Sequence, residues 1–279
     1  MKVKKFIGTV FFTLVVMAIF LSCASLGKAT REPDEFTNEQ EYYIGRAVAA
    51  NILAVYKLQN NVPALTSYAN RICNALVVNS ERPEIYNGYH VGILDSDEIN
   101  AFATPGGHIF ITRGLVKCAT SEDTLASIIA HEIGHILLQH GLEAISESRD
   151  AAEGKKQVLG LTQYLANSAG YGNSAQVIDL FGDVVGDALN TMVSKGYSRD
   201  QEYDADGKAL ELLSLAGYQP SSLLDMLRAL EKNQPGTKGG FNSTHPSPAQ
   251  RIENVQKKLS GYSVPDTRSY REARYNAAK

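Results

Sequence analysis

The chain has 279 residues, of which 44% are hydrophobic and 20% are charged, and its formal net charge is -3. This composition supplies enough apolar material for one sizeable core or two small ones, and it excludes a fibrous or disordered protein. Lysine and arginine are scattered along the chain and form no basic stripe, which argues against nucleic-acid binding. We therefore expect one globular domain of the size of an enzyme, without a nucleic-acid partner.

The N-terminus has the layout of a secretory signal. Three lysines within the first five residues precede an apolar run over residues 6–21, which is shorter than the roughly 20 residues that a spanning helix needs. The run ends in FLSC, which resembles the lipobox of bacterial lipoproteins, although Phe20 stands where leucine is usual. A signal peptide over residues 1–22 and a lipid on Cys23 are therefore predicted. The alternative is a retained N-terminal anchor, and both place the remaining chain outside the cytoplasm.

A polar tether and two helices are expected next. Residues 23–36 lack periodicity, which is typical of a linker. Thr37 and Gln40 resemble a capping box at the start of a helix that runs to residue 58. A second helix is expected over residues 63–78.

Short β-type runs follow the two helices. They cover residues 88–95, 100–104 and 108–112, and Pro105-Gly106-Gly107 favours a turn between the last two. These runs predict a small antiparallel sheet. Cys73 and Cys118 fit no disulfide framework of known spacing, so a disulfide and two free thiols both remain open.

The second half of the chain is predicted to be helical. Ser121 can cap a long helix that ends near Ser148, and residues 151–196 indicate less firmly packed helices that cover a cleft. A domain over residues 37–262 is expected to close with three further helices, one loop and a solvated polar tail: helices over 198–215, 220–232 and 249–260, the loop over 233–248, and the tail over 263–279.

The stretch IIAHEIGHILLQH carries the clearest functional signal. His131 and His135 are four residues apart, and on a helix that advances about 100° per residue they point the same way. Two neutral imidazoles on one face can hold a zinc ion, and Glu132 is placed to act as the general base of metal-assisted hydrolysis. The alternative is a pair of hydrogen-bonded core histidines beside a surface glutamate.

A catalytic zinc needs a third protein ligand. The extended metzincin pattern requires glycine and histidine where the chain has Leu138 and Gly141, and His140 is one residue out of that register. Glu202 lies further along, in a predicted helix, and can complete a His/His/Glu set. Asp206, four residues later on the same face, can accept a hydrogen bond from the outer nitrogen of one histidine.

A plainer interpretation competes for these acidic residues. Acidic side chains at the start of a helix stabilise its dipole, and this explains Asp200 and Asp204 well. It explains Glu202 and Asp206 less well, because these two share one face of the helix. We therefore predict a site role for Glu202 and Asp206.

Four stretches together resemble a known family. INAFATPGGHIFITRGL, HEIGH, SRDQEYDAD and THPSPAQRI match, in order and spacing, the gluzincin metallopeptidases that include the heat-shock protease HtpX and the CAAX prenyl proteases. The similarity covers residues 39–259. It implies a mainly helical α+β fold of the zincin type, with the small sheet against the active-site helix. Because no membrane span follows residue 21, the chain looks like the lipoprotein branch of this family.

The resemblance also implies roles for individual residues. His131, His135 and Glu202 would bind zinc, and Glu132 would be the base. Further residues would hold the peptide or its oxyanion or lie near the site: Asn100, His245 and Arg251. Asn100 closing a turn and Arg251 on a helix surface are equally open.

Substrate binding and latency are expected around this site. Strand 108–112 matches an edge that a substrate extends as an added β-strand. His245 precedes a proline, which favours extended backbone, and can either donate to the oxyanion or fill the fourth zinc position and keep the enzyme latent. We favour the latent form over the oxyanion role and over a remote surface histidine.

The predicted function is a zinc-dependent endopeptidase. The resemblance implies that it degrades misfolded or stalled envelope proteins from the periplasmic side, held at the outer membrane by an N-terminal lipid anchor. Unfolded polypeptides would be its partners. The alternatives are an inactive zinc-binding chaperone and another zinc hydrolase such as a cell-wall amidase.

Overall fold

The computed structural model describes residues 36–144, 196–233, 245 and 247–278. The predicted signal peptide, Cys23, the tether and most of residues 151–196 lie outside the described residues. The elements within the described ranges are, in chain order, α2 (Asn38–Val55), α3 (Pro63–Val77), β1 (His90–Leu94), β2 (Ala101–Ala103), the 3-10 turn η1 (Pro105–Gly107), β3 (His108–Thr112), α4 (Arg113–Cys118), α5 (Glu122–Leu137), α8 (Arg199–Leu215), α9 (Ser222–Asn233), α11 (Pro248–Leu259) and α12 (Arg268–Ala278).

The sheet is mixed, so the expectation of a wholly antiparallel sheet was wrong. Its strand order is β1-β3-β2, with β1 parallel to β3 and β2 antiparallel to β3. The turn at η1 joins β2 and β3 as a hairpin, which makes this pair antiparallel. β1 lies on the other side of β3 and runs parallel to it. The chain therefore crosses over between β1 and β2.

β3 is consequently the central strand and not an edge. It pairs with β1 from His108 to Thr112 and with β2 from Ile109 to Ile111, so the expected addition of a substrate strand to β3 was also wrong. The far side of β1 receives an isolated bridge between Leu94 and Leu58. Among the described residues, β2 is paired only on its β3 side.

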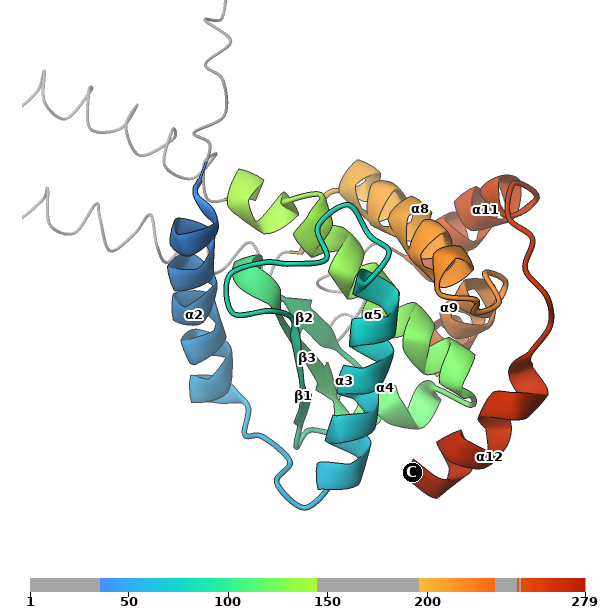
Figure 1. Ribbon diagram of the computed structural model, residues 1–279, viewed down its shortest axis with the longest axis horizontal. Coiled ribbons are helices and arrows are strands. Elements are labelled where there is room, and N and C mark those ends of the chain that lie inside the picture. The colour runs from blue at the N-terminus through green and yellow to red at the C-terminus, as the bar shows by residue number, and fades with distance from the viewer. Residues whose placement is uncertain (1–35, 145–195, 234–244, 246, 279) are drawn as a thin grey trace, which may run out of the picture. The chain divides into compact units, whose positions relative to one another are not determined.

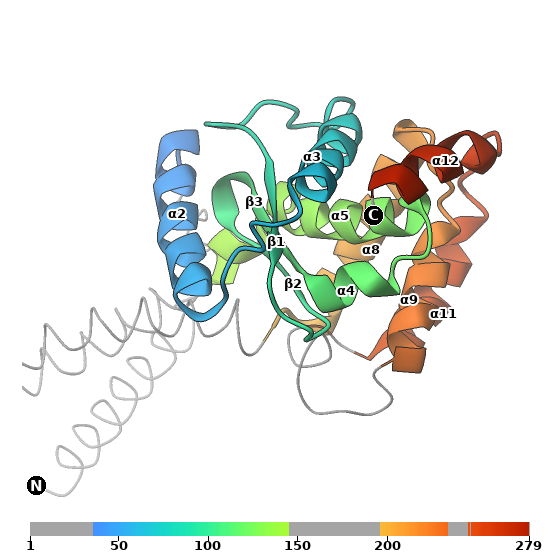
Figure 2. The same cartoon turned by 90° about the horizontal axis from the view of Figure 1, so that it is seen from below.

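The two faces of the sheet contribute to separate apolar clusters. Residues that alternate along the strands, such as Ile109 and Ile111, join the main core beneath α3, α5 and α9. Phe102 and Phe110 face the other way and pack with Val48 of α2 in a smaller cluster. The sheet therefore separates α2 from α5, as Figures 1 and 2 show.

α5 is buried along its whole length. Ser121 caps it and forms a capping box with Thr124. The helix ends at Leu137, because Gln139 has a positive φ of 57°, and the predicted continuation to Ser148 is therefore interrupted. Residues 140–144 are helical again, beyond this bend.

α8 packs closely against α5. Ser198 caps it, so the helix begins at Arg199, one residue after the predicted start, and Gly217, with φ of 74°, follows its end. The helices approach each other where Gly134 faces Ala205: a Cβ atom on Gly134 would lie 2.9 Å from the carbonyl oxygen of Ala205. α8, α9 and α11 gather on the side of α5 that is remote from α2 (Figures 1 and 2).

The C-terminal segment is not a solvated tail. It contains α12, in which Arg271 and Tyr275 are buried. The hydroxyl of Tyr275 donates to the carbonyl oxygen of Ala119, 2.7 Å away. The polar composition misled the prediction, since the buried polar groups of α12 are matched by partners on the rest of the domain.

The two cysteines among the described residues form no disulfide. Cys73 and Cys118 are free, and Cys73 is fully buried in the main core.

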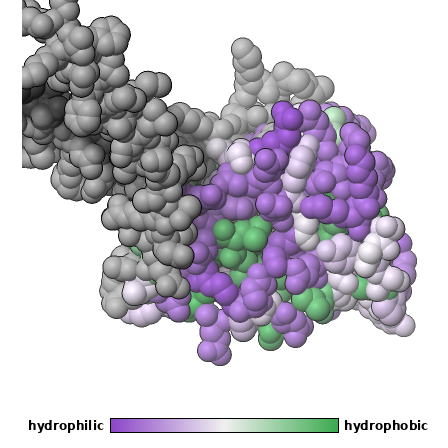
Figure 3. Space-filling model, turned by 90° about the horizontal axis from the view of Figure 1, so that it is seen from above, coloured by the Kyte–Doolittle hydropathy of each residue, from purple (hydrophilic) through white to green (hydrophobic). Residues whose placement is uncertain are grey.

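The face shown in Figure 3 is mainly hydrophilic, with a smaller hydrophobic area near its centre. No helix in the described ranges is both long and apolar enough to cross a bilayer.

Candidate metal centre

Four buried side chains converge between α5, α8 and the residues before α11. They are His131, His135, Glu202 and His245, and one ligand atom from each lies within 4.8 Å of all the others. The helical spacing of four residues brings the two histidines of α5 to the same face. Glu202, in the first turn of α8, faces them because α8 packs against α5 at Gly134.

The Nε2 atoms of the two α5 histidines point into this cluster. They lie 3.2 Å apart, and each lies 3.4 Å from one carboxylate oxygen of Glu202. His245 approaches the same carboxylate, with its Nδ1 2.6 Å from Oε1. Two imidazoles and a carboxylate, with one further imidazole in reach, are a donor set that suits zinc.

One buried oxygen supports the fit to a cation. Oε1 of Glu132 has no hydrogen-bond partner among the described residues, and Glu132 is 1% exposed. A buried carboxylate oxygen without a hydrogen-bond partner is costly unless a positive charge compensates it. The described residues therefore fit a divalent metal at this position.

The outer nitrogen of His131 has a carboxylate partner. Its Nδ1 lies 3.2 Å from Oδ1 of Asp206, the arrangement expected from the spacing of Glu202 and Asp206. Arg251 binds the same carboxylate through two contacts of 2.9 and 2.6 Å, and its Nη1 lies 3.0 Å from Oε2 of Glu202. Arg251 thus lies in the centre of the site, 1% exposed, and not on a helix surface.

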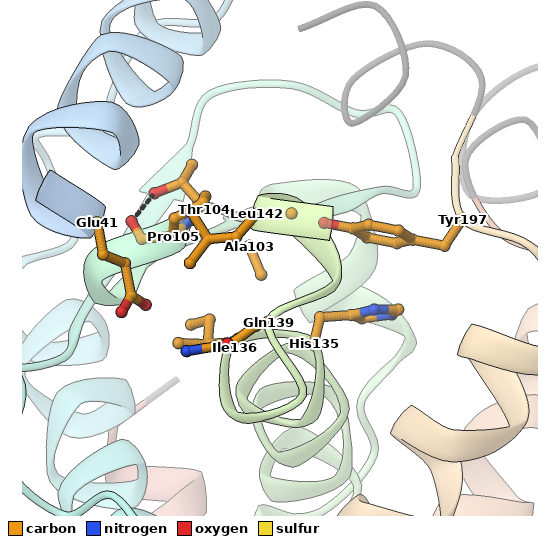
Figure 4. Close-up of a pocket in the computed structure, with 10 residues that line it drawn as sticks. Glu41, Ala103, Thr104, Pro105, His135, Ile136, Gln139, Leu142 and Tyr197 are labelled. Carbon is orange, nitrogen blue, oxygen red and sulfur yellow. Dashed lines mark hydrogen bonds between the residues drawn. The ribbon is translucent and has the colours of Figure 1, made fainter. Parts of the chain in front are cut away.

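The outer nitrogen of His135 has a different partner, which the sequence analysis missed. Its Nδ1 lies 2.9 Å from Nδ1 of His140, and the ring of Tyr197 stacks on His135 with centroids 4.1 Å apart. Figure 4 shows the rings of His135 and Tyr197 facing each other. Sequence spacing gave no signal for His140, because in an unbroken helix it would point away from His135; the bend at Gln139 reverses that.

Burial and charge shift the pKa values of the carboxylates in opposite directions. Burial raises the pKa of Glu132, which makes this carboxyl a better proton acceptor. Burial opposes ionisation of Glu202 as well, but His245 and Arg251 hold its pKa well below its ordinary value. Glu202 therefore stays a carboxylate, as a metal ligand must, while Glu132 is suited to proton transfer.

The two α5 histidines differ in the same way. Burial would lower the pKa of His131, but the carboxylates of Asp206 and Glu202 raise it to about 9. Burial lowers the pKa of His135 to about 3, although Glu202 opposes this. In the metal-free protein these shifts favour a charged imidazole at His131 and a neutral one at His135.

Asn100 lies immediately before β2. Its backbone N–H donates to the hydroxyl of Thr112 at 3.0 Å, and its side-chain oxygen accepts from the N–H of Ala101 at 2.9 Å. These contacts fix the start of β2, next to its central neighbour β3. They agree with the interpretation of Asn100 as a residue that shapes the backbone there.

A small pocket adjoins the cluster (Figure 4). His135 and Tyr197 form one wall, Ala103 at the end of β2 another, and Glu41 from α2 approaches from the opposite side. The pocket therefore links His135, one of the candidate metal ligands, to the end of β2.

Comparison with known proteins gives one family. Residues 63–259 match the model of peptidase family M48. The chain is 28% identical over 196 residues to the mitochondrial metalloendopeptidase OMA1 of Schizosaccharomyces pombe and 28% identical over 203 residues to the beta-barrel assembly-enhancing protease of Escherichia coli K12. It is also 28% identical over 202 residues to the metalloprotease LoiP of Escherichia coli K12.

The covered shares differ between the chain and these relatives. The three alignments cover 70%, 72% and 71% of this chain. They cover 53% of OMA1 and 40% of the assembly-enhancing protease, so the chain spans about half the length or less of these two, and 73% of LoiP.

Proposed function

Because the chain belongs to peptidase family M48, we propose that it is a zinc-dependent endopeptidase that cleaves unfolded proteins of the bacterial envelope. The observation that carries this proposal is the buried cluster of His131, His135 and Glu202 with Glu132 beside it. A structural zinc site would need four closed ligands and would have no use for a buried base.

His131, His135 and Glu202 would hold the metal. When bound, zinc would polarise the scissile carbonyl and lower the pKa of the attacking water. Asp206 and Arg251 position this set, since Asp206 contacts Nδ1 of His131 and Arg251 lies against both carboxylates. These contacts fix the orientation of the ligand side chains before the metal arrives.

Glu132 would act as the general base and then as the acid. Its buried carboxylate accepts the proton of the attacking water and returns it to the leaving amine. Burial raises its pKa above the ordinary value of a glutamate, which favours both transfers.

His245 would keep the resting enzyme latent. Its Nδ1 lies 2.6 Å from Glu202, and its ligand atom belongs to the same cluster, within 4.8 Å of the others. These distances favour the fourth-ligand role over the oxyanion role, because a ligand that fills the open position excludes the water. They also argue against a remote surface histidine.

The substrate would add to β2 as an extended segment. β2 is the strand with a free side among the described residues, and its last residue, Ala103, lines the pocket beside His135. Backbone hydrogen bonds would hold the substrate, so an unfolded chain would bind with little side-chain preference. Asn100, which shapes the start of β2, would help to hold the peptide.

The location would be the periplasm. The N-terminal apolar run and the FLSC sequence support a cleaved signal peptide and a lipid on Cys23, which would anchor the protein to the outer membrane. The name of the beta-barrel assembly-enhancing protease agrees with an envelope setting for one relative.

Product sequencing tests the proposal. The full-length protein with zinc, in detergent, is incubated with an unfolded outer-membrane β-barrel protein and, in parallel, with the same protein folded. We expect cleavage of the unfolded form at many sites, little cleavage of the folded form, and none with Glu132→Gln. His245→Ala is run alongside, because latency would mask activity. If neither the wild type nor His245→Ala cleaves the unfolded protein, the proposal is contradicted.

A further inference from the structure

We infer that His140 is a positioning residue for the metal site: its imidazole fixes the tautomer and the ring orientation of His135. This inference rests on the proposed metal-binding function of the cluster. It begins from the contact of 2.9 Å between the Nδ1 atoms of the two rings, both of which are buried.

The contact determines where one proton lies. Two Nδ1 atoms at 2.9 Å share a single proton, because two protons would repel and none would leave two lone pairs facing each other. Nε2 of His135 points into the cluster and needs its lone pair for the metal. The proton therefore belongs to Nδ1 of His135, and this N–H donates a hydrogen bond to Nδ1 of His140.

The backbone is shaped to make this contact. In a continuous α-helix, residues five apart lie about 140° apart around the axis, so His140 would face away from His135. The chain instead leaves α5 after Leu137, and Gln139 adopts a φ of 57°, a left-handed conformation that is uncommon outside glycine. This bend turns His140 back onto the helix that it has just left.

Tyr197 completes the enclosure of His135. Its ring stacks on the imidazole at 4.1 Å with an interplanar angle of 18°, and its centroid lies 5.7 Å from that of His140. Stacking on Tyr197 thus restricts the tilt of the His135 ring, and the hydrogen bond to His140 sets which ring nitrogen faces the cluster. His131, in contrast, is oriented by the carboxylate of Asp206.

The two partners differ in charge. Asp206 places a negative charge behind His131, whereas a neutral imidazole behind His135 adds none. The site already contains the buried carboxylates of Glu132, Glu202 and Asp206. A neutral acceptor orients the second histidine without adding a fourth buried carboxylate.

Zinc affinity tests the inference in the full-length Glu132→Gln protein, which avoids self-cleavage. Competition with a chromogenic chelator measures the dissociation constant for zinc. His140→Phe keeps a buried ring but has no acceptor, and we expect affinity about 10–100-fold weaker. His140→Asn places an oxygen the same number of bonds from Cβ as Nδ1, and we expect it to recover most of the loss. His90→Phe, at an exposed position of β1, should leave the affinity unchanged.

Each result decides between two statements. If Glu132→Gln alone binds no zinc, the proposed function fails. If it binds zinc tightly and His140→Phe binds equally well, or if His140→Asn is as weak as His140→Phe, the positioning role fails and the proposed function stands. An equal loss in His90→Phe also overturns the positioning role.

A second measurement needs no substitution at His140 and remains valid if His140→Phe does not fold. In zinc-loaded Glu132→Gln protein labelled with 15N-histidine, NMR reports which ring nitrogen carries the proton. We expect the proton on Nδ1 of His135 and on Nε2 of His140. A proton on Nδ1 of His140 overturns the inference.

Discussion

Arg271, near the C-terminus, binds both carboxylate oxygens of Asp123 in the first turn of α5, through Nε at 2.9 Å and Nη2 at 2.8 Å. One turn further along α12, Arg274 forms the same kind of pair with Glu122. α12 therefore holds the start of the helix that carries both candidate metal-binding histidines. This is a structural role for residues that the composition of the segment marks as solvated.

The pair between Arg271 and Asp123 is expected to contribute strongly to stability. Both side chains are buried, so Arg271→Ala leaves a buried carboxylate unpaired and should lower the free energy of unfolding by about 3–5 kcal/mol. Arg268→Ala, in the same helix, removes an exposed pair with Asp266 and should change the free energy of unfolding far less. Urea titrations of the two variants measure the difference, and equal losses would contradict the assigned role of α12.

Acid should weaken the contact between α12 and the start of α5. Burial raises the pKa of Glu122, but hydrogen bonds from Arg274, Tyr68 and Tyr218 lower it below its ordinary value of 4.5. A depressed pKa contributes stability above about pH 4.5, and this contribution is lost as the pH falls through the lower folded pKa. The free energy of unfolding should therefore fall more steeply from about pH 5 to pH 3 in the wild type than in Glu122→Gln. Parallel pH profiles would show that Glu122 is not responsible.

Metal binding and catalysis should separate between Glu132 and His135, two residues of α5. Glu132→Gln keeps the candidate ligands, so it should retain zinc while the cleavage rate falls by about 10²–10⁴-fold. His135→Ala removes a ligand and should lose both zinc and cleavage. Metal analysis by mass spectrometry, together with cleavage of an unfolded protein, measures both properties. Full activity in Glu132→Gln, or wild-type protein without zinc, would refute the catalytic assignment.

His245→Ala should raise basal cleavage with zinc retained. If His245 fills the open position in nine of ten resting molecules, its removal should raise the rate about tenfold. The initial rate on an unfolded protein and the zinc content are measured together. A lower rate at unchanged zinc content would instead assign His245 to the oxyanion.

The lipid prediction is tested at Cys23. Cys23→Ala should release the protein from membranes or leave the precursor uncut, because the lipid would be the anchor. Membrane fractionation and the intact mass of both forms give the answer. A wild-type mass that still includes residues 1–22 would favour a retained anchor.

The sequence predicted what depends on local spacing. The four-residue interval between His131 and His135, and again between Glu202 and Asp206, requires only a helix for its consequence. The capping residue Ser121 was likewise found, and the start of α8 was predicted to within one residue, because a cap acts within one turn. Most of the helices, and the two pairs of site residues that share a helix face, followed from such local rules.

The errors arose where distant segments decide the outcome. Three β-type runs do not specify their order, so β3 was taken as an edge although it pairs on both sides. His140 was set aside because it is one residue out of the metzincin register. Its contact with His135 was missed because that contact depends on the left-handed backbone of Gln139, which the residue type does not predict. The polar character of α12 was taken as a sign of exposure, because its partners, Glu122 and Asp123, lie about 150 positions earlier in the chain.

The close approach of α5 and α8 at Gly134 and Ala205 sets the distance between the candidate metal ligands on the two helices. Gly134 lies between the two histidines of α5, and Ala205 lies between Glu202 and Asp206, so the separation of the helix axes sets the span of the ligand cage. A single methyl group at position 134 would widen that span without contacting the ion. Ion preference could therefore drift in evolution through a residue that binds nothing, with every ligand unchanged.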